Sequence, residues 1–357
     1  MESHKRPLDM VEIARALPEM DFVMVGAPVD KRIVDRLVTE NPPNLHYLGS
    51  VSDHLKKDLI RKCSVGVTTS VYEGFGWTPF EFLSKCRPVL ARPLPVFKEI
   101  YGGALIYASN AAEFVEQLRA LSKSGFQANI PRESIERFRS TYNFSKAALR
   151  ASRVFGRSFT ILGRDLPTDS EFVLGSYLVN WRLWKAFVDN GAHVAILSNG
   201  SKFSRQFGLL DRTTLVGRVL LPFRKKLHAL EERDEPLDRA RKILNLAVLS
   251  LEPLCFVQSY VKNRKAMPSP FIVASDESGL FAAIVLKRML GKKIGFLVHD
   301  ARFHSLIWTA GSLPVRVYYL LFSYCLGHAD CVVVVSKATR AELCLFYPHP
   351  ERVILLW

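Results

Sequence analysis

The chain has 357 residues, and at about 150 residues per domain this length predicts two domains, each with its own core. Apolar residues make up 48% and charged residues 23% of the sequence, which excludes a disordered or fibrous chain and is typical of a globular protein. The net charge of +15 favours phosphates, acidic polymers or anionic lipid surfaces as partners without choosing among them.

The six cysteines contain no C-x-x-C pair, so we expect buried, reduced thiols, a cytoplasmic location and no metal site. The N-terminus lacks the apolar core of a signal peptide, and no stretch reaches the roughly 18 to 20 apolar residues that span a bilayer. The longest apolar stretch, Val315 to Leu326, precedes Gly327-His328-Ala329-Asp330. It predicts a buried helix that leads into a strand.

Residues 1 to 156 alternate short apolar strands with amphipathic helices, which predicts a parallel sheet covered on both faces. The expected helices are 8–17, 31–39, 54–61, 79–84, 112–121 and 145–154, and the expected strands are 22–25, 45–48, 65–68, 88–91 and 104–107.

A second series of the same kind begins at Ser158 and predicts a second Rossmann-like α/β domain over residues 158 to 357. The domain boundary is expected near Phe155-Gly156-Arg157. The expected strands are 159–162, 193–197, 271–273, 294–298, 331–335 and 353–356, with helices over 173–190 and 338–346 and a mostly helical stretch over 225–264.

Ligands of such sheets bind beyond the carboxyl ends of the strands, and two such domains facing each other make a cleft. The loop after strand 65–68 contains Glu73, Gly74, Gly76 and the pair Thr78-Pro79, which predicts an N-cap followed by a first-turn proline. Its glycines let the backbone approach a ligand, and a helix N-terminus suits a phosphate. Thr78 and Glu81 also fit a capping box, so a purely structural role for Glu81 stays open.

This region resembles the retaining GT-B glycosyltransferases of family 4. Glu73 and Glu81 have the E-x7-E spacing of that family, within Glu-Gly-Phe-Gly-x-x-Pro-x-Glu. The similarity continues through Arg87-Pro88-Val89-Leu90-Ala91, Pro95 to Ile100 and Gly103 to Tyr107.

The resemblance implies that residues 1–156 bind a nucleotide-sugar donor without a cofactor or a metal. Glu73 would contact the transferred sugar and Glu81 the ribose hydroxyls, while Lys5 would meet the diphosphate. The remaining implied donor-binding residues are Gly49 and Val51, beside the nucleobase, and Gly74, Phe75 and Gly76.

Residues 158–357 resemble the acceptor-side domain of the same family. Gly175 fits its glycine loop, Gly191 to Val194 its strand entry, and Ala329 to Thr339 its A-D-x-[apolar]4-S-x-x-[ST] segment. His299, followed by Asp300, stands where that family has an active-site histidine. A histidine at a strand end is also often a structural residue, and both interpretations stay open.

The domain order is swapped relative to the family, because the donor-type half comes first. The chain also opens after the expected first donor strand and its arginine, and Cys86 stands where a glycine is usual. We expect either the middle of a tandem enzyme, which we favour, or a rearranged enzyme. Because Lys5 lies on a segment without that strand to hold it, and Arg6 should point elsewhere, we expect weak catalysis by the isolated chain.

The partners implied by the resemblance are a nucleotide sugar and a glycan or lipid-linked acceptor. Arg224-Lys225-Lys226 and Lys262-Asn263-Arg264-Lys265 could form a peripheral contact with an anionic membrane at its inner face, although a charge run is usually a solvated face. We find no nucleic-acid module.

We therefore expect a retaining glycosyltransferase with two Rossmann-like domains in swapped order. The other enzyme classes considered are a nucleotide-sugar epimerase or a phosphorylase, which the E-x7-E spacing disfavours. A non-catalytic nucleotide-sugar-binding or scaffold protein is the alternative from a different class.

Overall fold

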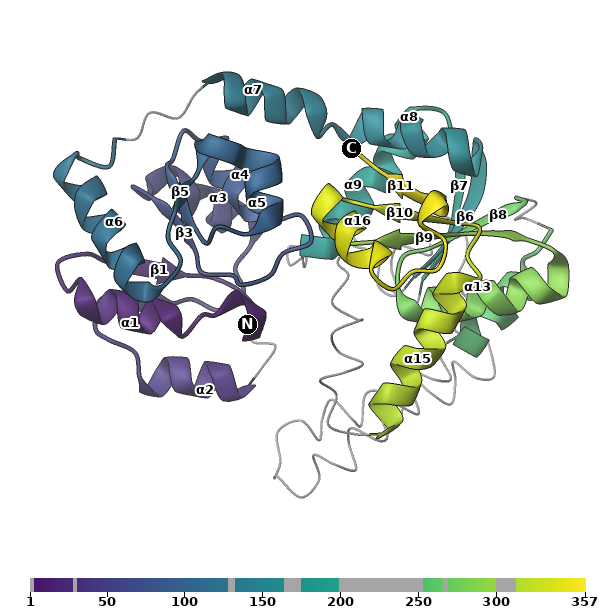
Figure 1. The fold of residues 1–357 in the computed structure, drawn as a ribbon, viewed down its shortest axis with the longest axis horizontal. Helices are drawn as coiled ribbons and strands as arrows, with labels where there is room; N and C mark the ends of the chain where they lie inside the picture. Colours follow the sequence, from purple (N-terminus) through teal and green to yellow (C-terminus); the bar gives the residue numbers. More distant parts are fainter. Residues whose placement is uncertain are drawn as a thin grey trace. The chain divides into compact units, whose positions relative to one another are not determined.

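The computed structural model describes residues 3–27, 31–127, 132–163, 175–198, 253–265, 269–299 and 313–357. These residues form two compact units, the first ending at Tyr142 and the second beginning at Asn143 (Figure 1).

The first unit has parallel strands in two sheets. β1 (Phe22–Met24) pairs with β2 (Leu45–Tyr47), and β4 (Val89–Ala91) pairs with both β3 (Gly66–Thr68) and β5 (Ile106–Tyr107). The single parallel sheet expected from the sequence is therefore split, because no backbone ladder joins β1 to β3 in the described part of the unit. The helices are α1 (Asp9–Ala16), α2 (Lys31–Thr39), α3 (Asp53–Lys62), α4 (Trp77–Leu83), α5 (Pro95–Tyr101), α6 (Ala111–Lys123) and α7 (Arg132–Thr141), with short 3-10 turns at Ser3–Lys5 and Gly102–Ala104.

One apolar core joins the elements of this unit. α1 contributes Val11 and Ile13, and α6 contributes Phe114 and Leu118, all of which are buried together with Leu90 of β4. The apolar residues of α1 and α6 recur at helical spacing, so each helix presents one apolar stripe to the strands. This packing holds both sheets against the same pair of helices.

The second unit is built on a six-stranded, entirely parallel sheet in the order β11-β10-β9-β8-β6-β7. Strands β8, β9 and β10 are continuous apolar runs whose residues are buried almost throughout, as expected for strands covered on both faces. The strands are β6 (Ser158–Gly163), β7 (His193–Ser198), β8 (Phe271–Ala274), β9 (Lys293–Val298), β10 (Cys331–Val334) and β11 (Val353–Leu355). The helices are α8 (Phe144–Phe155), α9 (Gly175–Asp189), α13 (Glu277–Leu290), α15 (Leu313–Gly327) and α16 (Lys337–Cys344), with a further helical stretch over 253–262 and a 3-10 turn at Pro350–Arg352.

The α/β class and the parallel strands expected from the sequence are confirmed. Helix α8, assigned above to the first domain, packs instead against α9 of the second unit. Helix α15 forms where an apolar helix was expected, but its complete burial was predicted wrongly. Among its described side chains Phe322, Cys325 and Leu326 are buried, whereas Val317, Leu320, Leu321 and Tyr324 are exposed. Much of the expected helical stretch 225–264 lies outside the described residues.

The described residues were searched for membrane-spanning helices and for groups of metal-binding side chains. None of their helices combines the length and the apolar character needed to cross a bilayer. Among the same residues, no group of three or more His, Cys, Asp or Glu side chains is arranged to hold a metal ion.

The expectation that all cysteines are buried is wrong, because Cys86 is exposed and Cys63 and Cys344 are only half-buried. The backbone of Cys86 has a φ of 55°, in the left-handed region where a Cβ costs roughly 1 to 2 kcal/mol. This conformation is a physical reason for a glycine at the turn after α4.

We predict that Cys86→Gly raises the free energy of unfolding of the protein by up to about 1 kcal/mol. Glycine removes the backbone strain of the folded state, and this gain exceeds the free-energy cost of the greater conformational entropy that glycine gives the unfolded chain. Urea unfolding followed by circular dichroism measures the change. Cys63→Gly is the control, since Cys63 has a φ of −67° and its replacement should lower stability. A destabilised Cys86→Gly protein would contradict the strain argument.

Candidate functional site

The loop between β3 and α4 places the first expected site residues. Thr68, Thr69 and Ser70 at the end of β3 are buried, and the chain then turns through Glu73 to Gly76 before α4 begins at Trp77. Helix α4 has only seven residues. The carboxylate of Glu73 thus lies at the carboxyl end of a parallel strand, the edge at which open α/β sheets bind their ligands.

Gly76, and not Thr78, is the N-cap of α4, so the predicted Thr78 cap is wrong. Gly76 has φ 75° and ψ 73°, and a Cβ at this position would approach Cε1 of Phe97 to 2.2 Å. The hydroxyl of Tyr101 donates a hydrogen bond to the Gly76 carbonyl at 2.5 Å, and burial raises the pKa of Tyr101 well above its ordinary value. Gly76 is therefore required by local packing, whether or not a ligand approaches it.

Phe75 is buried and belongs to an aromatic cluster. Its ring stacks on Trp77 with centroids 4.4 Å apart and meets Tyr142 edge-on at 5.2 Å. Phe138 of α7 stacks on Phe80 at 4.1 Å in the same cluster. Any contact of Phe75 with a donor, which stays a prediction, would use the backbone rather than the ring.

Lys5 and Glu73 are brought together across 68 residues of sequence. Nζ of Lys5 donates to Oε1 of Glu73 at 2.6 Å, and the two side chains are 39% and 12% exposed. A lysine ammonium has three donors and a carboxylate has two oxygens. Both groups therefore keep hydrogen-bonding capacity beyond the bond that joins them.

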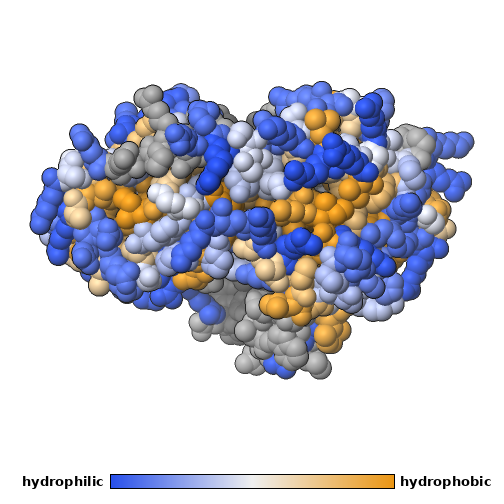
Figure 2. Space-filling model, turned by 45° about the horizontal axis from the view of Figure 1, so that its top comes forward, coloured by the Kyte–Doolittle hydropathy of each residue, from blue (hydrophilic) through white to orange (hydrophobic). Residues whose placement is uncertain are grey.

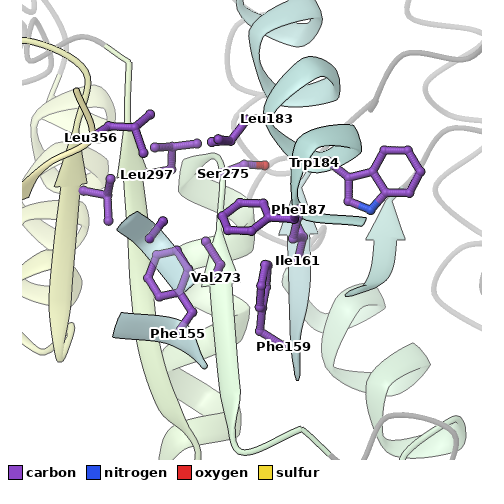
Figure 3. Close-up of a pocket in the computed structure, with 12 residues that line it drawn as sticks. Phe155, Phe159, Ile161, Leu183, Trp184, Phe187, Val273, Ser275, Leu297 and Leu356 are labelled. Atoms are coloured by element: carbon purple, nitrogen blue, oxygen red, sulfur yellow. The ribbon is translucent and has the colours of Figure 1, made fainter. Parts of the chain in front are cut away.

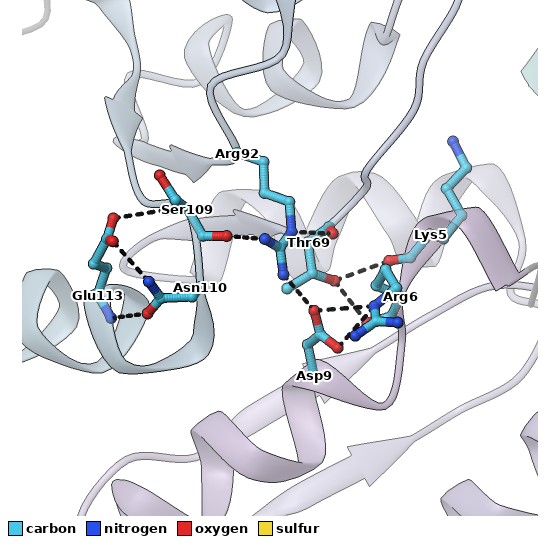
Figure 4. Close-up of polar contacts among 8 residues, drawn as sticks. All are labelled: Lys5, Arg6, Asp9, Thr69, Arg92, Ser109, Asn110 and Glu113. Atoms are coloured by element: carbon cyan, nitrogen blue, oxygen red, sulfur yellow. Dashed lines mark hydrogen bonds and ion pairs between the residues drawn. The ribbon is translucent and has the colours of Figure 1, made fainter.

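A buried polar network holds the segment that contains Lys5 (Figure 4). The hydroxyl of Thr69 donates to the carbonyls of Lys5 and Arg6 at 2.9 and 3.0 Å. Arg92 donates to the carbonyl of Thr69 at 2.9 Å and pairs with the buried carboxylate of Asp9 at 2.5 Å. This network connects the start of α1, the end of β3 and the end of β4.

These contacts correct the expectation that Lys5 is poorly held. The amide of Val71 also donates to the carbonyl of His4 at 2.9 Å, so the segment is fastened to the loop after β3 by its backbone. Nε of Arg6 donates to Asp9 at 3.1 Å. The Arg6 side chain is thus directed to Asp9, consistent with the expectation that it points elsewhere than Lys5.

Glu81 lies within α4 and is not part of a capping box, because α4 begins at Trp77 rather than after Thr78. Oε1 of Glu81 accepts a hydrogen bond from Nζ of Lys56 on α3 at 2.9 Å, and Lys56 also pairs with Asp53 at 3.2 Å. Burial lowers the pKa of Lys56, but attraction to Glu81 and Asp53 outweighs it, so the pKa is raised overall. Lys56 therefore remains charged beside Glu81.

Gly49 and Val51 lie between β2 and α3. Gly49 has a φ of 66°, with open space where its Cβ would be, and its carbonyl accepts from the amide of Gly26 at 2.8 Å. Val51 is half-buried and precedes Ser52, whose hydroxyl caps α3 by accepting from the Leu55 amide at 3.2 Å. A base-binding role for this turn stays a prediction.

The expected residues of the second unit lie at element ends. His299 directly follows β9 and is half-buried, and Gly175 is the first residue of α9. Asp300 lies outside the described residues, so the His299-Asp300 pair stays untested.

The Ala329 to Thr339 segment has structural roles. Asp330 accepts from the Ile294 amide at 2.7 Å and pairs with Lys287 at 2.6 Å. Ser336 caps α16 by accepting from the Thr339 amide at 3.0 Å. These bonds fix both ends of β10.

An apolar cavity of about 20 Å³ lies in the second unit, among side chains from its sheet, α8 and α9 (Figure 3). Its lining includes the side chains of Phe155, Phe159, Phe187, Trp184 and Leu297. Its volume is about that of one water-sized sphere, and apolar cavities of this kind are usually dry. It is a gap in core packing and not a substrate site.

Sequence reasoning missed the residues that support the site. Asp9, Thr69 and Arg92 meet only in the folded unit, and no spacing along the chain connects them. The pairing of Lys56 with Glu81 was missed for the same reason, because the two residues lie on different helices. The positions at strand ends were the available signal, and they indicated only Thr69 and its neighbours.

Comparison with known proteins relates the first unit to one family. Residues 6–124 match the family model described as Glycosyl transferases group 1, a match that covers most of the first unit and none of the second. No curated protein matches the chain. A crystal structure from Mycobacterium smegmatis has 10% sequence identity over 86% of this chain and 86% of that chain, with a TM-score of 0.26, too low to support any inference.

We predict that Asp9→Asn lowers the free energy of unfolding by about 3 kcal/mol, because it leaves the Arg92 guanidinium without its buried counter-charge. Thermal or urea unfolding measures the loss. Glu40→Gln is the control, since it breaks the exposed pair between Arg36 and Glu40 and should leave the unfolding midpoint unchanged. Equal effects of the two substitutions would contradict a special role for the network.

Proposed function

We propose that the first unit is the nucleotide-sugar-binding domain of a retaining glycosyltransferase. The observation on which this rests most heavily is the contact between Lys5 and Glu73 at the end of β3. Glu73 lies within residues 6–124, which are similar to group 1 glycosyltransferases, and Lys5 directly precedes them. The unit would bind the nucleoside diphosphate of the donor and orient its sugar.

The Lys5–Glu73 pair suits a diphosphate ester of a sugar. With Glu73 neutralised by Lys5, the phosphates would not meet a bare carboxylate, and Lys5 has donors left for a phosphate oxygen. The free oxygen of Glu73 can accept from a sugar hydroxyl. As the sugar leaves, negative charge grows on the diphosphate, and a fixed ammonium stabilises that charge more than it stabilises the bound donor.

Glu81 supports the same assignment at the nucleoside end. One of its oxygens is bonded to Lys56, which leaves the other to accept from ribose hydroxyls. Because Lys56 holds the carboxylate in one orientation, a ribose would meet an ordered acceptor at smaller entropic cost. Since α4 is short, we assign the phosphates to Lys5 and not to the start of this helix.

We propose an acceptor-binding role for the second unit, with His299 contacting the acceptor or the sugar and Gly175 in the acceptor-side loop. The swapped domain order and the retained anomeric configuration belong to the same proposal. The acceptor class would be a glycan or a lipid-linked saccharide.

A non-catalytic nucleotide-sugar-binding protein is the alternative, because the contacts of Lys5, Glu73 and Glu81 account for donor binding without requiring turnover. A transfer or hydrolysis assay with radiolabelled nucleotide sugars on the full chain separates the two. Sugar release above the uncatalysed rate supports the enzyme, whereas donor binding without release supports the alternative.

We predict that Lys5→Met weakens binding of a nucleoside diphosphate about 10- to 100-fold, since a charge-assisted hydrogen bond contributes about 1.5 to 3 kcal/mol. Calorimetric titration of UDP and GDP measures the affinity. Lys85→Met, which removes an exposed lysine, is the charge-matched control and should bind as the wild type does. Equal affinity of Lys5→Met and the control would contradict the assignment of Lys5.

We predict that Lys56→Met weakens the same nucleotide about 3- to 10-fold, because Glu81 loses the ammonium that orients it. Lys57→Met is the matched control, since Lys57 lies next in the same helix and pairs with Asp53 at 2.5 Å but not with Glu81. Glu81→Gln should weaken binding at least as much as Lys56→Met. If Glu81→Gln binds as tightly as the wild type, the ribose assignment is wrong.

A further inference from the structure

Helix α15 has an exposed apolar face. Val317, Leu320, Leu321 and Tyr324 follow one another at helical spacing, and each is 51–58% exposed. The opposite face is buried, with the ring of Phe322 packed edge-on to the ring of Phe296 at 5.6 Å. The helix is therefore anchored by one stripe and presents a second stripe of apolar side chains outward.

Helix α13 extends this face. Val285 and Met289 are exposed, four residues apart, and Arg288 between them donates to the hydroxyl of Tyr324 at 3.1 Å. That bond places the exposed side of α13 beside the exposed side of α15. Figure 2 shows apolar atoms, in orange, near the lower edge of the view, where α15 runs downward in Figure 1.

The exposed apolar side chains of α13 and α15 are contiguous, which indicates an interaction site. Scattered exposed apolar side chains are normal on a protein surface, but a contiguous group from two packed helices marks an interaction site. We name the exposed residues Val285, Met289, Val317, Leu320, Leu321 and Tyr324 the α13/α15 face.

The charges around the α13/α15 face select the partner. Arg288 and Arg316 are exposed on the two helices, and α15 contains no Asp or Glu. In a two-fold contact between copies, the exposed arginines of this face would meet one another, which is unfavourable. An anionic lipid surface offers both a complementary charge and an apolar interior.

We propose that the α13/α15 face docks the protein on the surface of an anionic lipid bilayer, with its apolar side chains in the interface and Arg288 and Arg316 at the headgroups. The 15 residues of α15 correspond to a length of about 22 Å, so the helix lies in the interface rather than across it. Tyr324 has the amphipathic character that favours this depth. The inference is independent of the proposed sugar transfer.

Vesicle flotation of the full chain tests this inference. The vesicles are phosphatidylcholine alone or phosphatidylcholine with about 30% phosphatidylglycerol, whose anionic headgroups attract basic surfaces. We expect the wild type to bind the anionic vesicles at least tenfold more tightly than the neutral ones. A double variant, Leu320→Glu with Leu321→Glu, should bind the vesicles at least tenfold more weakly. A second double variant, Arg288→Gln with Arg316→Gln, should lose about fivefold in affinity per arginine, and only for the anionic vesicles.

Leu345→Glu is the matched control, because Leu345 is 82% exposed after α16 and outside the α13/α15 face. It should bind vesicles as the wild type does. Circular dichroism and urea unfolding report whether each variant is folded. Unchanged vesicle binding by the folded Leu320/Leu321 variant would overturn the proposal. Two results with the wild type would also overturn it: no binding to any vesicle, or self-association through this face in sedimentation without lipid.

Discussion

The buried ion pair between Asp9 and Arg92 is the interaction on which the candidate site depends. Arg92 leaves the end of β4, reaches the carbonyl of Thr69 after β3, and meets Asp9 in the first turn of α1. Because a buried charge without its partner is costly, these three segments are held in one arrangement. Lys5 is fixed through Thr69 as a consequence, and its ammonium is held against Glu73. The chemistry proposed for the first unit therefore rests on contacts within the protein that hold Lys5 in place.

Much of the fold follows from local patterns in the sequence. Helix 31–39 was predicted with the bounds that α2 has, and the buried strands of the second unit were predicted as apolar runs. The start of α4 was predicted wrongly because Thr78-Pro79 imitates a cap, whereas the packing of Phe97 and Tyr101 around Gly76 decides the position. Helix α15 was predicted as buried because hydropathy alone does not distinguish a core helix from one with an outward apolar face.

The candidate site was predictable only in part, for a physical reason. Glu73 and Glu81 lie on one loop and its helix, so their spacing is visible in the sequence. The partners of these carboxylates, Lys5 and Lys56, come from other elements and are set by tertiary packing. The resemblance named Lys5 but not its bond to Glu73, and it gave no indication of Lys56. Pairing each carboxylate with a lysine is the feature of this site that only the folded chain reveals.

The two proposals concern different units and complement each other chemically. A donor domain that holds a nucleoside diphosphate through Lys5 acts on a water-soluble substrate. A lipid-docking face on the second unit, which we propose takes the acceptor, would bring the chain to a surface where lipid-linked acceptors are found. The glycan or lipid-linked acceptor class expected from the sequence is compatible with such a surface.

The central claim is that the network around Asp9 and Arg92 prepares the end of β3 to bind a nucleoside diphosphate. Hydrogen–deuterium exchange of the full chain, with and without saturating UDP or GDP, tests it most directly, because protection reports where a ligand orders the backbone. The account predicts new protection in the amides of residues 3–6 and 70–81. Protection confined to residues 143–357, or no change with either nucleotide, would contradict it.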